Sequence, residues 1–170
     1  MKNKRTWIMG VFTGLVVLAF FLPWVEVQSS AVGAISKLLT GKRQATLDTI
    51  SGFQVPIMAN GPDARFMVDI ITIFNPGIKN ADKKSWLIWV DPLFAVLLGV
   101  FYVRFWNKKW FQVLVGAVGV CIFAVGVFYI ARTDLNKLII NVKIASGLWL
   151  TLVGYLGIGV VAMTALLEKK

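Results

Sequence analysis

The sequence has no histidine and only one cysteine, Cys121, among its 170 residues. Without an imidazole, the chain lacks the usual ligand for haem, copper or zinc and the usual side-chain acid or base. A single thiol excludes an intrachain disulfide and a Cys-x-x-Cys redox pair. These absences exclude thiol oxidoreductases, and we expect no metal and no cofactor.

Acidic residues and catalytic motifs are also scarce. The chain has eight Asp and Glu residues, and charged residues make up only 15% of it. It contains no Walker loop, dinucleotide fingerprint or nucleophile elbow. A membrane enzyme needs titratable groups that converge on a pocket, and the apolar segments offer only Asp91, near one end. We therefore expect a protein that is not an enzyme and has no catalytic residues.

Long apolar runs make up most of the chain. Hydrophobic residues account for 58% of it, and this composition excludes an ordinary soluble domain. Four segments are long enough, or nearly so, to cross a hydrocarbon core of roughly 30 Å. They cover 6–22, 92–106, 111–131 and 146–167. We therefore predict an all-α membrane protein, a four-transmembrane-helix bundle.

Basic residues predict the orientation of this bundle. Eight of them flank the spans on the side that carries both termini: Lys2, Lys4, Arg5, Arg104, Lys108, Lys109, Lys169 and Lys170. The positive-inside rule places that side in the cytoplasm. Despite the net charge of +10, these residues are spaced as membrane anchors and not as a basic domain. We expect phospholipids among the partners and no nucleic acid.

The tryptophans and the N-terminus bear on the same topology. All seven tryptophans fall at predicted span ends, as an aromatic belt would: Trp7, Trp106 and Trp110 on the inner side, and Trp24, Trp86, Trp89 and Trp149 on the outer side.

A cleaved signal peptide is the alternative for the first apolar run, and we expect this run to be retained as the first helix. The long loop has no Asn-x-Ser/Thr sequon, so a bacterial plasma (inner) membrane fits best.

The long first loop predicts a small extracytoplasmic α+β subdomain. Alternating residues predict strands at 24–28, 46–55 and 138–144, which together would form a small sheet. Amphipathic spacing predicts helices at 31–39 and 64–74. The predicted organisation is a first transmembrane helix in 1–25, the loop subdomain in 26–85, a second helix and cytoplasmic turn in 86–109, a third helix in 110–131, an outer loop with a strand in 132–145, and a fourth helix with a cytoplasmic tail in 146–170.

This layout resembles the claudin-like four-transmembrane (tetraspan) proteins. Trp24 follows the first span as the family pattern requires, and Gly52-Phe53 matches the Gly-Leu-Trp element loosely. The two cysteines of the family pattern are absent, so its disulfide cannot be carried over. The chain also looks like uncharacterised bacterial four-span proteins that share Leu22-Pro23-Trp24 and the Ser-Gly-Phe of 51–53. The resemblance implies an architecture and no activity.

Asp91 is the single acid that could lie at membrane depth. One interpretation is a possible polar membrane site, because a charge in lipid costs several kcal/mol and is usually functional. The other is a helix N-cap at the outer interface, because Pro92 suits the first helical position. Tyr155, Thr151 and Gln112 are the remaining polar groups of the third and fourth spans, and we expect them to form hydrogen bonds between helices.

Small residues on the helices are the candidates for interaction. They allow backbones to approach closely in lipid, either inside the bundle or against a neighbouring subunit. The interaction candidates are Gly116, Gly119, Gly126, Gly147, Gly154, Gly157 and, in the loop, Phe53. The partners would be other integral membrane proteins or further copies of the same chain.

Together these features favour a non-catalytic integral membrane accessory or scaffolding subunit. It would dock on a larger membrane complex through its helix faces and its extracytoplasmic loop subdomain. An oligomeric pore or a small transporter component is the alternative.

Overall fold

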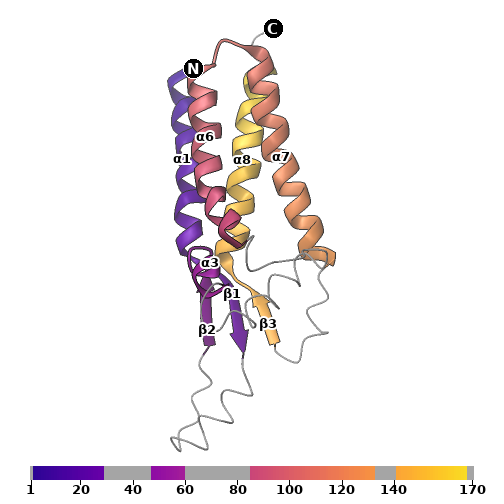
Figure 1. Ribbon diagram of the computed structural model, residues 1–170. Coiled ribbons are helices and arrows are strands. Elements are labelled where there is room, and N and C mark those ends of the chain that lie inside the picture. Colours follow the sequence, from indigo (N-terminus) through magenta and orange to yellow (C-terminus); the bar gives the residue numbers. More distant parts are fainter. Residues whose placement is uncertain (1, 29–46, 60–84, 133–140, 168–170) are drawn as a thin grey trace, which may run out of the picture.

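Four long helices lie side by side in the protein (Figure 1). The structure, a computed structural model, describes residues 2–28, 47–59, 85–132 and 141–167. The helices are α1 (Lys2–Phe21), α6 (Val90–Arg104), α7 (Lys109–Arg132) and α8 (Ser146–Leu167). All four are long and apolar enough to cross a membrane, the second of them together with η1 (Ser85–Trp89), the 3-10 turn before α6. The predicted four-helix bundle is therefore confirmed, and α8 has its predicted bounds.

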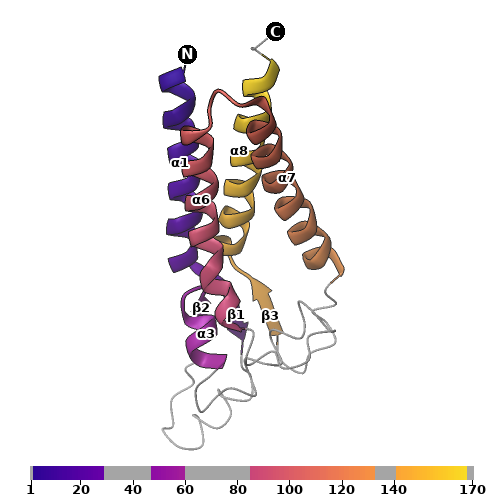
Figure 2. The same ribbon diagram turned by 45° about the horizontal axis from the view of Figure 1, so that its top comes forward.

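Helix α8 occupies the central place in this bundle. It packs against α1 on one side and α7 on the other, while α6 lies mainly against α1. Helix α7 leans away from the other helices towards the end where the strands lie (Figure 2). The start of α1 and the end of α8 lie together at the opposite end. The chain thus forms an antiparallel bundle in which α8 links its neighbours.

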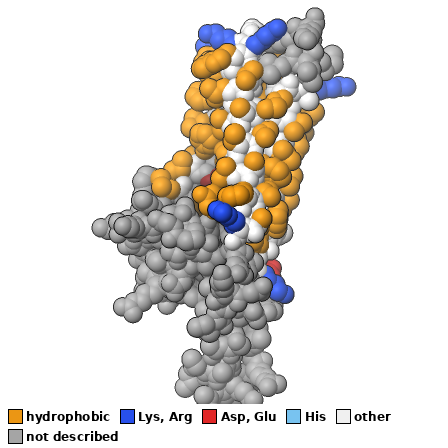
Figure 3. All heavy atoms as spheres, turned by 90° about the vertical axis from the view of Figure 1, so that its right-hand side faces the viewer, with side chains coloured by type: hydrophobic (Ala, Val, Ile, Leu, Met, Phe, Trp, Pro, Cys, Tyr) orange, Lys and Arg blue, Asp and Glu red, His pale blue; other side chains and the backbone are white. Residues whose placement is uncertain are grey.

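Large apolar and aromatic side chains fill the interior of the bundle. The largest fully buried ones include Met9 from α1, Tyr102 from α6, Val115 from α7, and Tyr155 and Ile158 from α8. Hydrophobic side chains also cover the outward face that Figure 3 shows. Helices that are apolar on all sides are typical of membrane spans. The structure is therefore compatible with a multi-pass membrane protein.

A three-stranded antiparallel sheet lies at one end of the bundle. Its strands are β1 (Pro23–Gln28), β2 (Leu47–Ser51) and β3 (Asn141–Ile144), in the order β2-β1-β3. Val25 of β1 pairs with Ile50 on one side and Ile144 on the other. Val25 and Ile50 are buried, and the side chains of β-strands alternate between the two faces of a sheet. The predicted pairing of these three segments is confirmed.

The strand predicted at 46–55 is wrong in its second half. Strand β2 ends at Ser51, and a turn leads into the short helix α3 (Gln54–Ala59). The Gln54 side chain accepts hydrogen bonds from the Ser51 N–H and hydroxyl at 3.0 and 3.2 Å, which closes this turn. Pro56 lies in the first turn of α3, where its missing N–H costs no helical hydrogen bond. The predicted helices at 31–39 and 64–74, and the predicted strand residues 138–140, lie outside the described residues.

The close approach of α7 and α8 at Gly119 generates a prediction. A Cβ at Gly119 would lie 2.7 Å from the Tyr155 carbonyl oxygen and 2.8 Å from the Gly159 nitrogen. Both atoms are helix backbone and cannot move aside, so we expect Gly119→Ala to destabilise the bundle by about 1–3 kcal/mol. Thermal unfolding in detergent micelles, followed by tryptophan fluorescence, measures this loss.

Gly14→Ala in α1 is the matched control. A Cβ at Gly14 would meet no atom within 4 Å. Because alanine also favours a helix, this variant should unfold at or slightly above the wild-type temperature. Equal stabilities of the two variants would show that α7 and α8 do not pack at this distance.

Candidate functional site

The junction between the bundle and the sheet is held by hydrogen bonds around the end of α1. The indole N–H of Trp24 donates to the Ala19 carbonyl at 2.9 Å. The N–H of Phe53 donates to the Phe20 carbonyl at 3.1 Å, and the N–H of Ala145 donates to the Trp24 carbonyl at 2.9 Å. The last turn of α1 therefore connects directly to β1 and to the turn after β2, while β1 in turn connects to the residue after β3.

An aromatic cluster surrounds these hydrogen bonds. We call it the aromatic collar, and it consists of Phe20, Phe21, Trp24, Phe53 and Trp89. The rings of Phe53 and Trp89 stack with centroids 5.8 Å apart and an angle of 11° between them. The Trp89 indole N–H also donates to the Phe53 carbonyl at 3.2 Å. The collar therefore ties the start of α6 to the turn between β2 and α3.

Phe53 is the predicted interaction candidate that lies in this collar. Its side chain remains 41% exposed although it contacts three other rings. The contact between Trp89 and Phe53 was not predicted from the sequence, because 36 residues separate them. The one sequence feature that pointed to this region was the position of Trp89 at a predicted span end.

Asp91 lies near the collar, in the first turn of α6. The N-cap of α6 is Trp89, which has no side-chain capping hydrogen bond, so of the two interpretations of Asp91 the N-cap is wrong. Helix α6 continues directly from η1, and Asp91 is therefore already inside the helix. An acid in the first turn of a helix still interacts favourably with the helix dipole.

Asp91 is tied to α8 through its backbone carbonyl, while one oxygen of its carboxylate lacks a hydrogen bond among the described residues. The hydroxyl of the fully buried Tyr155 donates to the Asp91 backbone carbonyl at 2.7 Å. The Oδ2 atom of Asp91 is buried and makes no hydrogen bond within the described part of the chain. A buried carboxylate oxygen without a donor is costly, so Asp91 is a polar weak point of the bundle.

Gln112 of α7 and Thr151 of α8 donate hydrogen bonds to backbone carbonyls close to them in the sequence. The Gln112 amide donates to the Trp106 carbonyl in the turn between α6 and α7. The Thr151 hydroxyl donates to the Gly147 carbonyl of its own helix at 3.0 Å. Of the three side chains predicted to bond between helices, Tyr155 therefore does so, whereas Thr151 does not.

Metal-ligating residues do not gather anywhere in the described residues. No group of three or more His, Cys, Asp or Glu side chains is found in these ranges. Cys121 is exposed on α7. Neither Cys121 nor Asp91 thus belongs to a cluster of such side chains in the part of the chain that the structure describes.

The glycines chosen as interaction candidates all face other parts of the chain. A Cβ at Gly116, Gly119 or Gly126 would contact α8, and one at Gly154 or Gly157 would contact α1. A Cβ at Gly147 would lie 2.6 Å from the Pro23 carbonyl oxygen. By contrast, a Cβ at Gly10 or Gly14 would meet no atom within 4 Å. These two glycines were not among the candidates; their spacing of four places them on one side of α1 but does not tell whether that side is covered.

The contact between Tyr155 and Asp91 generates a second prediction. Tyr155→Phe removes the hydroxyl donor, and we expect it to lower the free energy of unfolding by about 0.5–1.5 kcal/mol. Asp91→Asn keeps the backbone carbonyl and removes the ionisable group, so it should leave stability unchanged or raise it. Thermal unfolding in micelles compares both variants with the wild type. A loss of more than about 1 kcal/mol in Asp91→Asn would mean that the carboxylate makes a stabilising contact.

Comparison with known proteins adds no assignment to this geometry. The chain matches no protein-family model, no curated protein and no solved structure.

Proposed function

We propose that the protein is a non-catalytic integral membrane accessory or scaffolding subunit. It docks on a larger membrane complex through its terminal sheet, with the helix faces as a second contact. The observation that carries this proposal is the attachment of a small sheet to the end of an apolar bundle by hydrogen bonds and ring contacts. Both neighbours of β1 are edge strands, since β2 and β3 pair only with β1 within the described residues.

The surface of the bundle supports placement in a membrane. Large apolar side chains such as Leu18, Leu93 and Val125 point outwards with more than half of their surface exposed. An exposed apolar surface of this extent is unfavourable in water and favourable in lipid. Lys4, Arg104, Lys108 and Lys109 lie at the end opposite the sheet, and the positive-inside rule then places the sheet outside the cytoplasm.

The geometry of the β3 edge supports docking by strand addition. The N–H of Ala145 donates to Trp24, and hydrogen-bonded pairs alternate along an antiparallel ladder. Lys143 therefore faces Glu26 with its backbone groups, whereas the backbone groups of Val142 point away from β1. An extended segment of a partner can pair with these outward groups.

The alternative, an oligomeric pore, would have to form between copies of the chain. Tyr102, Val115 and Ile158 are fully buried and fill the interior of the bundle. The single chain thus offers a binding scaffold more readily than a conduction path.

The orientation generates a third prediction, which the single cysteine makes simple to test. In a Cys121→Ser background, Thr49→Cys introduces a thiol at an exposed position of the sheet, and Asn107→Cys introduces one in the exposed turn after α6. A membrane-impermeant maleimide should label Thr49→Cys in intact cells and Asn107→Cys only after permeabilisation. The reverse pattern would contradict the proposed orientation, and labelling of both without permeabilisation would contradict membrane insertion.

The β3 edge generates a fourth prediction. Val142→Pro removes an outward-facing N–H and should leave the β1–β3 ladder intact, because proline is tolerated on an outer edge. We expect cross-linked partner complexes recovered from native membranes to fall by about five- to tenfold, from the loss of one main-chain hydrogen bond.

Two further variants control this experiment. Val142→Ala retains the N–H and should retain the complexes. Lys143→Pro breaks the ladder with Glu26, so it should lower the unfolding temperature as well as complex recovery. Unchanged recovery in Val142→Pro would rule out docking through this edge, and purification of the wild type as a lone monomer would contradict the proposed function itself.

A further inference from the structure

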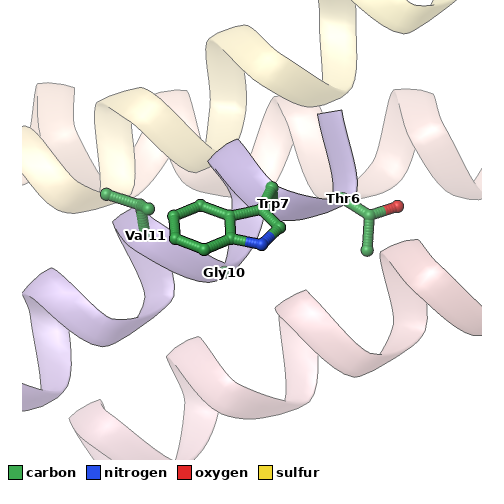
Figure 4. A pocket seen from close by; sticks show the side chains of 4 residues that line it. All are labelled: Thr6, Trp7, Gly10 and Val11. Carbon is green, nitrogen blue, oxygen red and sulfur yellow. The ribbon is translucent and has the colours of Figure 1, made fainter. Parts of the chain in front are cut away.

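A groove runs along the outer face of α1, close to its start. It has a volume of about 600 Å³ and is lined by Thr6, Trp7, Gly10 and Val11. In Figure 4 the Trp7 indole lies along the helix between Thr6 and Val11. Gly10 and Gly14, one turn apart, add no side chain to this face, and a Cβ at either would meet no atom within 4 Å. Gly10 therefore leaves room for the groove, and Gly14 continues the open strip by one more turn.

The groove faces away from the other helices. The opposite side of α1 is the packed one, where Phe12 and Val16 contact glycines of α8 and Thr13 contacts Gly99 of α6. The outward stripe follows the spacing of three and four along the helix, through Lys4, Trp7, Val11, Gly14 and Leu18. Its first member is cationic, its second carries an indole N–H, and the remainder is apolar.

Charge at this end of the bundle decides what can occupy the groove. The cationic side chains here are Lys4, Arg5, Arg104, Lys108 and Lys109. The three acids of the described ranges, Glu26, Asp48 and Asp91, all lie at the sheet end. An occupant that is anionic at the level of Lys4 and apolar beside Gly10 and Gly14 complements this distribution.

We propose that the α1 groove binds one anionic phospholipid. Its phosphate lies by the Lys4 ammonium and the Trp7 indole N–H, and one acyl chain runs over Gly10 and Gly14 along Val11 and Leu18. A second copy of α1 fits less well, because two copies inserted in the same orientation would bring their Lys4 and Arg5 side chains together. The proposal requires membrane insertion and does not depend on docking through the sheet.

Tryptophan quenching tests the proposal on the full chain. The protein is reconstituted in phosphatidylcholine vesicles that contain either brominated phosphatidylglycerol or the same amount of brominated phosphatidylcholine. The difference between wild type and Trp7→Phe isolates Trp7, which is 76% exposed. Trp110 is the internal reference, because it is 66% exposed at the same basic end and lies outside the groove.

The expected result is selective quenching of Trp7. Brominated phosphatidylglycerol should half-quench Trp7 at roughly fivefold lower content than brominated phosphatidylcholine does, the effect of one cation near an anionic headgroup. Trp110, isolated in the same way with Trp110→Phe, should show clearly weaker selectivity. Equal selectivity at the two tryptophans would overturn the proposal, since it would reflect general enrichment of anionic lipid.

Variants of the groove separate a lipid from other occupants. Gly10→Leu with Gly14→Leu fills the groove with side chains that meet open space, and it should abolish the selectivity at Trp7. Val100→Leu, at an exposed position of α6, is the matched control and should preserve it. Lys4→Gln should remove most of the preference for phosphatidylglycerol. Unchanged selectivity in the filled variant would overturn the proposal, and so would a change in the number of chains per particle, which would identify a second copy as the occupant.

Discussion

The direct contact of α8 with its two neighbours is the constraint on which the rest of the structure depends. At Gly119 the backbone of α7 lies against the backbone of α8, and at Gly154 and Gly157 side chains of α1 enter the space that missing side chains leave on α8. In lipid the hydrophobic effect contributes little to the association of helices, so close packing of this kind must provide the stabilising free energy. Because α8 joins α1 to α7, its glycines fix the positions of both.

The same arrangement determines where the sheet can form. Strand β1 follows α1 after one residue, and β3 is separated from α8 only by Ala145. Since α1 and α8 are packed together, β1 and β3 emerge side by side and pair. The collar then completes the junction with rings from α1, the turn after β2 and η1. The sheet is thus an extension of the helix packing, joined to the bundle by hydrogen bonds and ring contacts.

The sequence predicted the elements that have a strong local signal. Helix α8 has its predicted bounds because its apolar run is uninterrupted, and β1 and β3 were visible from the alternation of their side chains. Strand β2 was predicted too long, since the Gln54 side chain closes a turn that alternation does not show. The N-cap interpretation of Asp91 fails because η1 continues directly into α6, so that Asp91 already lies in the first turn of that helix.

The candidate site was less accessible to sequence reasoning. The pattern of small residues does not tell which face of a helix its neighbours cover, so Gly119 and Gly10 look alike until the packing is known. The stacking of Phe53 on Trp89 joins distant positions, and no local pattern specifies it. Contacts of this kind depend on the order of the helices in the bundle, which hydropathy and charge leave open.

The contact between Phe53 and Trp89 also affects how the chain tolerates change in its length. It holds the residues before and after segment 60–84 close together, through a ring stack and a hydrogen bond. When the two ends of a chain segment are held together, the entropy of closing it rises only slowly with its length, by about 0.6 kcal/mol for each doubling. A change in the number of residues between these two anchor points should therefore cost the packing of the helices little.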